Sequence, residues 1–271
     1  MTSTPVPLTA WNGTSHARAR RWLARLAALA FAALLLYPFS GMNAGVGPWQ
    51  WTGAAGADAL ASVRTSLLLT ALAMLAVIVL GTPMALYIRK AARWERLAWQ
   101  AVLLLSMLLP ALALGILLTL SLRPEAAVGA LLWRFGLVTS NSAAAFVITQ
   151  VYVSIGYYVL AAVVALESIP PGAEQQAALL GHRPGRVFVR ITLPLALPGL
   201  VVALSLAWAR AIGEFGAVVV TAYYPAGMPV QIWVDLQSRG LGAVMPLLLI
   251  FLLVALPLPL AAHILARRRH A

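Results

Sequence analysis

Long apolar stretches separated by short polar ones dominate the chain. A helix needs about 20 mainly apolar residues to cross a bilayer, and six stretches reach or approach that length. Because they are too long for barrel strands, all six are predicted to be helices. Their expected bounds are Trp22–Met42, Thr65–Ile88, Ala98–Leu122, Ala143–Leu166, Leu195–Ile212 and Ala243–Leu265. The pattern therefore predicts an all-α integral membrane protein with six transmembrane helices.

Several prolines lie within or near these stretches, and membrane helices tolerate them with a kink or a local break in the hydrogen-bond ladder. They are Pro83, Pro110, Pro198, Pro257 and Pro259. The first stretch follows a basic cluster, as a signal peptide would. We favour an uncleaved helix, because the apolar run is long and no small-x-small cleavage site closes it.

The lysines and arginines of the connections lie mainly on one side of the predicted membrane domain. That side holds Arg18, Arg20, Arg21, Arg25, Arg89, Lys90, Arg93, Arg96, Arg183, Arg186, Arg190, Arg267, Arg268 and Arg269, and the other holds Arg64, Arg123, Arg134 and Arg239. Since cytoplasmic connections carry the excess of positive charge, both termini are expected in the cytoplasm. Residues 1–21 then form a cytoplasmic tail, disordered over 1–17. Residues 22–266 form the membrane domain, and 267–271 form a basic cytoplasmic C-terminus.

Composition narrows the function classes. Of the 271 residues 62% are hydrophobic and 10% are charged, with a mean hydropathy of +0.90, whereas about 25% are charged in soluble domains. The net charge of +12 comes from short clusters between apolar runs, so it indicates membrane orientation rather than nucleic-acid binding. The absence of cysteine excludes disulfides and thiol chemistry. The four histidines are scattered, so neither a metal site nor a cofactor is expected.

The sequence contains no recognisable catalytic constellation. No Gly-x-Ser-x-Gly context unites a serine with a histidine and an acid. A Walker-type phosphate loop is also absent, and the chain's single lysine is Lys90. If ATP drives this protein, a partner must hydrolyse it, and the chain itself is not expected to be an enzyme.

The connection between the fourth and fifth stretches, 167–194, is long and lies on the basic side. Pro171 can begin a short helix, Gly181 can end it, and Pro184 follows. Next, Arg183, Arg186 and Arg190 share one helical face, before Thr192-Leu193-Pro194 is expected to turn the chain back into the membrane. This segment is either an ordinary loop or an element that docks into a groove of a cytoplasmic partner.

This connection resembles the signature loop of permease subunits of binding-protein-dependent ABC importers. That signature reads Glu-Ala-Ala, three residues, Gly, nine residues, Ile-x-Leu-Pro. Here Gly181 precedes Ile191-Thr192-Leu193-Pro194 by nine residues, and Ala177 takes the last alanine. Gln175 and Gln176 replace the first two signature residues, and Glu174 offers an acid one position earlier.

The resemblance extends from about residue 59 to the C-terminus, and it implies that the loop docks on an ATP-hydrolysing subunit. The residues implied in coupling are Glu174, Gln175, Gln176, Ala177, Ala178, Gly181, Ile191, Leu193 and Pro194. It further implies two permease chains, two ATPase chains and an external solute-binding protein, assembled in a bacterial cytoplasmic membrane.

Arg210 and Glu214 are charged residues at the end of the fifth stretch. Being four apart on a helix, they can neutralise each other, or they can line a gate or pathway. Both readings remain open at this point. The run Arg210–Ala217 resembles the fifth-helix motif of importers for molybdate, tungstate and sulfate. The candidate pathway residues are Arg210, Gly213, Glu214, Phe215 and Gly216.

The resemblance implies an inorganic oxyanion as the solute. The outer segment Tyr223–Pro229 does not match the molybdate pattern, so phosphonate, polyamine and ferric-iron importers remain alternatives. An ion-coupled secondary transporter is a different class, and it usually shows internal repeats and buried coupling acids. This chain has one candidate acid, Glu214, and no visible repeat, which favours the ATP-driven importer.

Overall fold

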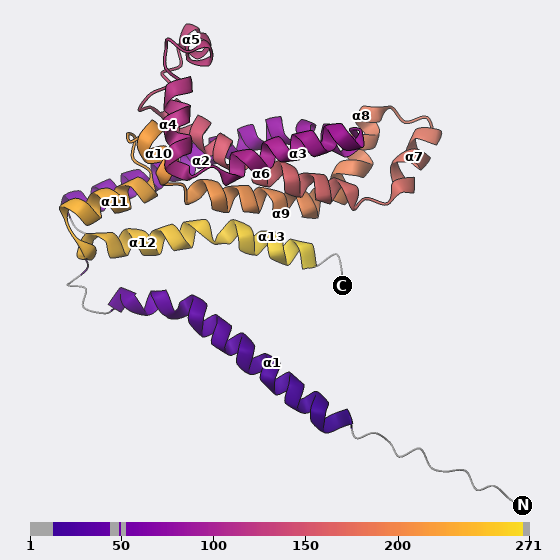
Figure 1. Ribbon diagram of the computed structural model, residues 1–271, viewed down its shortest axis with the longest axis horizontal. Coiled ribbons are helices and arrows are strands. Elements are labelled where there is room, and N and C mark those ends of the chain that lie inside the picture. The colour runs from indigo at the N-terminus through magenta and orange to yellow at the C-terminus, as the bar shows by residue number, and fades with distance from the viewer. Residues whose placement is uncertain (1–12, 44–48, 50–52, 268–271) are drawn as a thin grey trace, which may run out of the picture. The chain divides into compact units, whose positions relative to one another are not determined.

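The computed structural model describes residues 13–43, 49 and 53–267, and the regular structure in these ranges is entirely helical (Figure 1). The chain divides into two compact units, 1–48 and 49–271. The first contains α1 (Gly13–Leu36) and the 3-10 helix η1 (Tyr37–Asn43). Helix α1 begins well before Trp22, so the expected tail is helical over 13–21. Residues 1–12, where most of the predicted tail falls, and 268–271 at the C-terminus lie outside the described residues.

The second unit holds the remaining helices. In chain order they are α2 (Gly53–Lys90), α3 (Arg93–Leu108), α4 (Ala111–Ser121), α5 (Ala127–Arg134), α6 (Ala143–Glu167), α7 (Pro171–Leu179), α8 (Pro184–Val187), the π-helical turn η2 (Phe188–Thr192), α9 (Leu193–Ile212), α10 (Gly216–Thr221), α11 (Met228–Ser238), α12 (Leu241–Ala255) and α13 (Pro257–Arg267).

Within the described residues, five helical runs are long and apolar enough to cross a membrane. They are Arg20–Met42, Gly53–Lys90, Ala143–Glu167, Pro184–Ile212 and Leu241–Ile264. The bent pair α3 and α4 brings the number to as many as six, in agreement with the predicted helix count. The long apolar stretches of the sequence are thus the membrane-spanning elements of the fold.

The third predicted helix, Ala98–Leu122, is wrong as a single straight element. It is broken into α3 and α4, whose axes differ by 107° (Figure 1). Pro110 has no N–H to donate and disfavours the helical conformation of the residue before it. Leu109 is accordingly extended, with φ −64° and ψ 130°. The proline therefore changes the direction of the chain where only a kink or local break was foreseen.

The predicted turn at Thr192-Leu193-Pro194 is also absent. Helix α8, η2 and α9 form one run from Pro184 to Ile212. At η2 the ladder widens, because the Leu193 N–H donates to the Phe188 carbonyl five residues earlier. Since a proline ring clashes with the carbonyl of residue i−4, a wider turn before Pro194 lets the helix continue.

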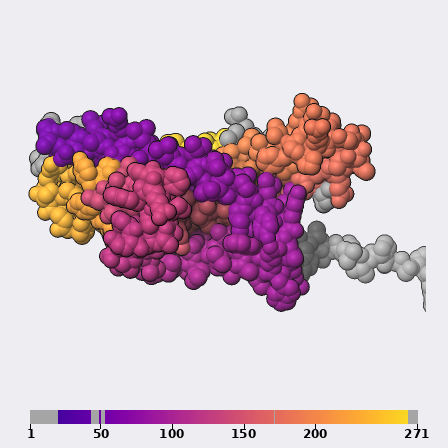
Figure 2. All heavy atoms as spheres, turned by 90° about the horizontal axis from the view of Figure 1, so that it is seen from above, coloured from indigo at the N-terminus to yellow at the C-terminus, as the bar shows by residue number. Residues whose placement is uncertain are grey.

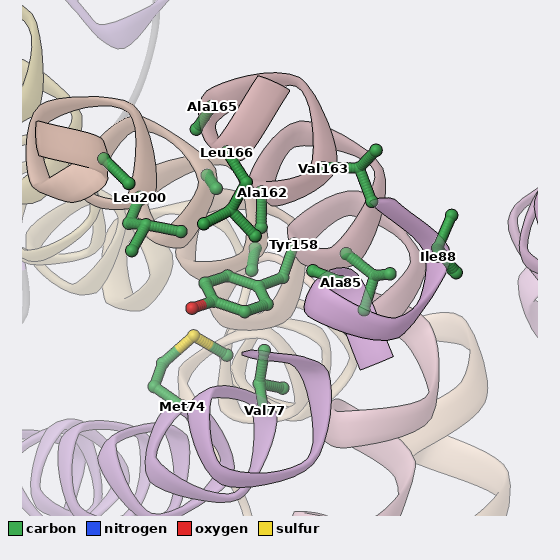
Figure 3. Close-up of a cluster of buried hydrophobic side chains, with 14 of the residues drawn as sticks. Met74, Val77, Ala85, Ile88, Tyr158, Ala162, Val163, Ala165, Leu166 and Leu200 are labelled. Atoms are coloured by element: carbon green, nitrogen blue, oxygen red, sulfur yellow. The ribbon is translucent and has the colours of Figure 1, made fainter. Parts of the chain in front are cut away.

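Helix α6 is the centre of the second unit and packs against α2, α3 and α9. Ser142 caps it by accepting the Ala145 N–H at 3.1 Å. Figure 3 shows the Tyr158 ring of α6 among side chains that include Met74 and Val77 of α2. Small residues allow these helices to approach closely, as is common in membranes.

Two glycines show how close the helices are. A methyl group at Gly199 of α9 would lie 2.4 Å from the Ala165 Cβ of α6. One at Gly81 of α2 would lie 2.7 Å from the Tyr158 ring. Buried hydrogen bonds add to this packing: Gln150 donates to the Ala211 carbonyl at 3.1 Å and so joins α6 to α9.

Candidate coupling and pathway sites

The short helix predicted in the 167–194 connection is α7, which lies with α8 at one end of the second unit (Figures 1 and 2). Pro171 occupies its first turn, where a missing N–H costs nothing. At its end the Gly181 N–H donates to the Ala178 carbonyl, and the His182 N–H donates to the Ala177 carbonyl. This is a Schellman motif, and the φ of +81° at Gly181 explains why glycine ends the helix.

Glu174 ties α7 to two other elements of the second unit. Its Oε1 accepts a hydrogen bond from Arg89 Nη1 at the end of α2, at 2.9 Å. The same oxygen accepts from Thr192 Oγ1 in η2, at 2.7 Å. The carboxylate therefore connects the surface helix to α2 and to the root of α9. Sequence reasoning did not connect either residue with Glu174, since no short-range pattern relates Arg89 to a residue 85 positions away.

The electrostatics of this contact favour the charged acid. Partial burial of the Glu174 carboxyl disfavours its ionised form. The hydrogen bonds from Arg89 and Thr192, together with the positive charges of Arg89 and Lys90, outweigh that effect and hold the pKa of Glu174 below its ordinary value. Glu174 is therefore ionised at neutral pH, and its tether to Arg89 is a full ion pair.

The remaining predicted coupling residues on α7 differ in exposure. Ala177 is 4% exposed, so its methyl group packs within this chain. Gln175, Gln176, Ala178 and Gly181 are exposed. Leu179 and Leu180, which sequence reasoning passed over, are 88% and 78% exposed. Two adjacent leucines thus lie uncovered within this chain at the end of a surface helix.

The Ile-x-Leu-Pro part of the signature lies inside the helical run rather than in a loop. Ile191 belongs to η2, and Leu193 and Pro194 begin α9. Thr192 between them is buried and bonds to Glu174. Glu174, just before the first half of the signature, therefore contacts the variable position of the second half.

At the other end of α9, Glu214 lies two residues beyond the last helical residue, Ile212, and its residue exposure is 3%. Its carboxylate is ion-paired with Arg210 and accepts the Ala217 N–H at 2.6 Å, which caps α10. A buried carboxylate requires such partners. The structure thus shows the mutual ion pair, one of the two readings of these residues. The Arg210 side chain is 29% exposed and remains accessible.

The break between α9 and α10 packs tightly against α4. A methyl group at Gly216 would lie 2.8 Å from the Ala111 Cβ, while one at Gly115 of α4 would lie 2.9 Å from the Ala217 carbonyl oxygen. Phe215 places its ring 5.7 Å from that of Trp233. Gly213, by contrast, has only ordinary contacts. The capping role of Glu214 could not be foreseen, because α10 falls in a stretch predicted to be a connection.

No group of three or more metal-ligating side chains occurs among residues 13–43, 49 and 53–267. What the described residues contain is a bundle of membrane helices with a surface helix at one end and a broken, charged helix end at the other. This arrangement defines a membrane permease subunit.

The chain belongs to the family of binding-protein-dependent transport system inner membrane components, whose model matches residues 77–270. A probable molybdenum ABC transporter permease protein of Haloferax volcanii is 35% identical over 207 residues, which cover 76% of this chain and 75% of that protein. The molybdenum transport system permease protein ModB of Mycobacterium tuberculosis is 35% identical over 201 residues, covering 73% and 75%. The molybdate/tungstate permease protein WtpB of Thermococcus kodakarensis is 26% identical over 210 residues, covering 78% and 80%.

Solved structures support the same fold. A bacterial ABC transporter involved in the import of alginate superposes with a TM-score of 0.69 at 19% identity, covering 92% of this chain and 96% of that one. The MetNI methionine transporter superposes with a TM-score of 0.60 at 18% identity, covering 76% and 94%. This protein is thus a permease subunit of an ABC importer and not an ion-coupled transporter.

Proposed function

We propose that this permease conducts an inorganic oxyanion, molybdate or tungstate, across the cytoplasmic membrane. The observation that carries the proposal is the kinship with permeases named for molybdenum and for molybdate/tungstate over about three quarters of the chain. The run Arg210–Ala217, with its accessible arginine, adds support from this chain's own residues.

The chemistry of the α9–α10 break is compatible with anion passage. The guanidinium of Arg210 offers several N–H donors and can contact an oxyanion while keeping its bond to Glu214. Because Glu214 neutralises much of that charge, the site would bind an anion weakly and release it easily. A pathway needs this property, since selectivity can reside in the solute-binding protein.

The experiment is uptake of labelled molybdate, tungstate and sulfate into cells that express the permease with its ATPase and binding protein. Cells carrying Arg210→Lys keep the charge but lose the forked geometry, and we expect slower uptake at unchanged permease abundance. Uptake of a phosphonate, a polyamine or ferric iron, with none of the three oxyanions moved, would overturn the solute assignment and leave the importer class intact.

Energy for transport would enter through α7. We propose that α7 docks on an ATPase subunit and that two copies of the permease enclose the pathway. The exposed Leu179 and Leu180 supply the apolar contact, and Glu174 links α7 to α2 and α9. A symmetric pair is the commonest arrangement of identical subunits. Cross-linking of the purified complex measures the permease stoichiometry, and a single permease chain per complex would contradict the pairing.

The orientation, with both termini in the cytoplasm, rests on the charge distribution. Because the chain has no cysteine, single cysteines can test it without background. Ala92 and Ala127 are both exposed, on opposite sides of the predicted domain. In intact cells a membrane-impermeant maleimide should label Ala127→Cys but not Ala92→Cys, and the reverse pattern would refute the proposed orientation.

A further inference from the structure

An apolar groove runs along the second unit between α2 and α9. Its volume is about 440 Å³, and its walls include Ile78 and Leu86 of α2 and Leu197 and Leu204 of α9. The pair Thr82 and Tyr158, whose hydroxyls are 2.7 Å apart, satisfies its own polar groups within the groove. The groove therefore offers hydrocarbon contacts and little else.

A basic pocket of about 470 Å³ continues the groove at the end where α2 stops. The two cavities share Leu86 and Phe188 as lining residues. The pocket adds Arg89, Lys90 and His182. Arg89 is paired with Glu174, which also lines the pocket, whereas Lys90 is exposed and forms no ion pair among the described residues. Lys90 and His182 are thus the groups best placed to meet an anionic ligand.

The order of the lining residues follows from helix geometry. Ile78, Thr82 and Leu86 line the groove and Lys90 lines the pocket, each four residues further along α2 and about 40° around it. From Ile78 to Leu86 the helix rises about 12 Å, and Lys90 lies about 6 Å further. One leaflet of the hydrocarbon core is about 15 Å thick. The apolar part of α2 that lines the groove is therefore about as long as one leaflet is thick, and Lys90 lies at the depth of the lipid headgroups.

We propose that this groove and pocket form a binding site for one anionic phospholipid of the cytoplasmic leaflet. An acyl chain lies in the groove, and the phosphate accepts hydrogen bonds from Lys90 and His182. Basic pockets at the cytoplasmic ends of membrane helices are suited to anionic headgroups. The site lies under α7, so the lipid fills the space between the coupling segment and the membrane helices. The inference rests on the proposed orientation, which makes this end cytoplasmic.

The charge of the site favours a lipid over a second copy of this chain. The cytoplasmic connections of any copy are rich in arginine, so a second chain would bring positive charge against Lys90. A free oxyanion would leave the apolar groove empty. An anionic lipid satisfies the charge and the hydrocarbon surface together.

The test uses the full-length permease purified in an uncharged detergent. Phosphatidylglycerol or phosphatidylcholine with the same acyl chains is added, and native mass spectrometry measures the fraction of permease chains that retain one lipid. We expect phosphatidylglycerol to be retained preferentially. Lys90→Gln should weaken its retention about five-fold and that of phosphatidylcholine less, because the choline ammonium already offsets the charge of that phosphate. Leu197→Trp, which fills the groove, should lower retention of both lipids.

Two control variants make the same chemical changes outside the site. Arg93→Gln removes a cytoplasmic charge near α2, and Leu195→Trp adds a ring to an exposed position of α9 that does not line the groove. Both should retain lipid like the wild type. Because the readout requires neither an ATPase nor transport, failure of the oxyanion assignment would leave its result unaffected.

Three outcomes would overturn the proposal. The first is equal retention of the two lipids, or equal losses in Lys90→Gln and Arg93→Gln. The second is an oligomer that dissociates in Leu197→Trp while phosphatidylglycerol retention is unchanged, which would assign the groove to a second copy. The third is Lys90-dependent binding of molybdate that phosphatidylglycerol does not displace, which would assign the pocket to a free oxyanion.

Discussion

Arg89, at the end of α2, donates a hydrogen bond to the carboxylate of Glu174 on α7 at 2.9 Å. This contact joins the surface helix to a membrane helix 85 residues earlier in the chain. Thr192 bonds to the same oxygen, so a displacement of α7 acts on α2 and α9 together. Glu174, one position before the first residue of the signature, thus binds within the chain's own framework.

Exchanging the charges tests that role. Arg89→Glu and Glu174→Arg, made singly, each place like charges together, and we expect the solute transported per ATP to fall about five-fold or more, with hydrolysis continuing. The double exchange restores an opposite pair and should recover much of the coupling. Failure of the double variant to exceed either single one would argue against a linkage through this pair.

Glu174 also gives the tether a pH dependence. The pKa of its carboxyl is lowered below the ordinary 4.5 in the folded protein, so the stabilisation is complete above that pH and is lost as the pH falls through the lowered value. A spin label on Gln175→Cys should therefore keep its mobility from pH 7 to pH 5 and become more mobile in stronger acid. In the Glu174→Gln background the label should be mobile throughout.

We expect Leu179 and Leu180 to lie in the interface with the ATPase. Replacing either leucine by glutamate should weaken co-purification of the ATPase at least about ten-fold, because a charge would be buried in an apolar contact. Ala92→Glu adds the same charge to an exposed residue of the α2–α3 connection, outside α7, and is the matched control. Undiminished ATPase recovery with both leucine variants would place the interface elsewhere.

The Arg210–Glu214 pair predicts a non-additive pattern of stability. Arg210→Gln leaves a buried carboxylate without its cation and should lower the free energy of unfolding by about 3 kcal/mol. The double variant with Glu214→Gln removes the buried charge as well, while its amide oxygen can still accept the Ala217 N–H. Thermal unfolding in detergent should find the double variant more stable than Arg210→Gln alone. Additive losses would contradict this.

The close contact at Gly199 allows the stability lost on separating α9 from α6 to be estimated. The Gly199→Ala methyl group would lie 2.4 Å from the Ala165 Cβ, so the helices must move apart, and we expect a loss of about 1–3 kcal/mol. Gly185→Ala, where nothing lies within 4 Å of the new methyl group, should cause no loss. Equal thermal midpoints for the two variants would show that the contact yields without cost.

The apolar pattern was sufficient to predict the membrane helices, because the bilayer demands a fixed length of apolar helix. The expected Ala143–Leu166 and Leu195–Ile212 became α6, Ala143–Glu167, and α9, Leu193–Ile212. Pro110 could be recognised as a break, but its 107° change of direction depends on the packing of α4 against α10. The partners of Glu174 could not be predicted from the sequence, because a contact between distant segments produces no periodic pattern of apolar residues.

The unbroken helical run from Pro184 to Ile212 can act as a lever. It comprises 29 residues, so it forms a rod about 43 Å long, with one end beside the surface helix and the other at the charged break. A rotation of about 5° about the end beside α7 would carry the far end by about 4 Å, which is most of the rise of a helical turn. The wide turn at η2 lies near that pivot, where a looser ladder permits bending without disturbing the rest of the rod. A small movement at α7 would thus produce a larger displacement of the residues around Arg210.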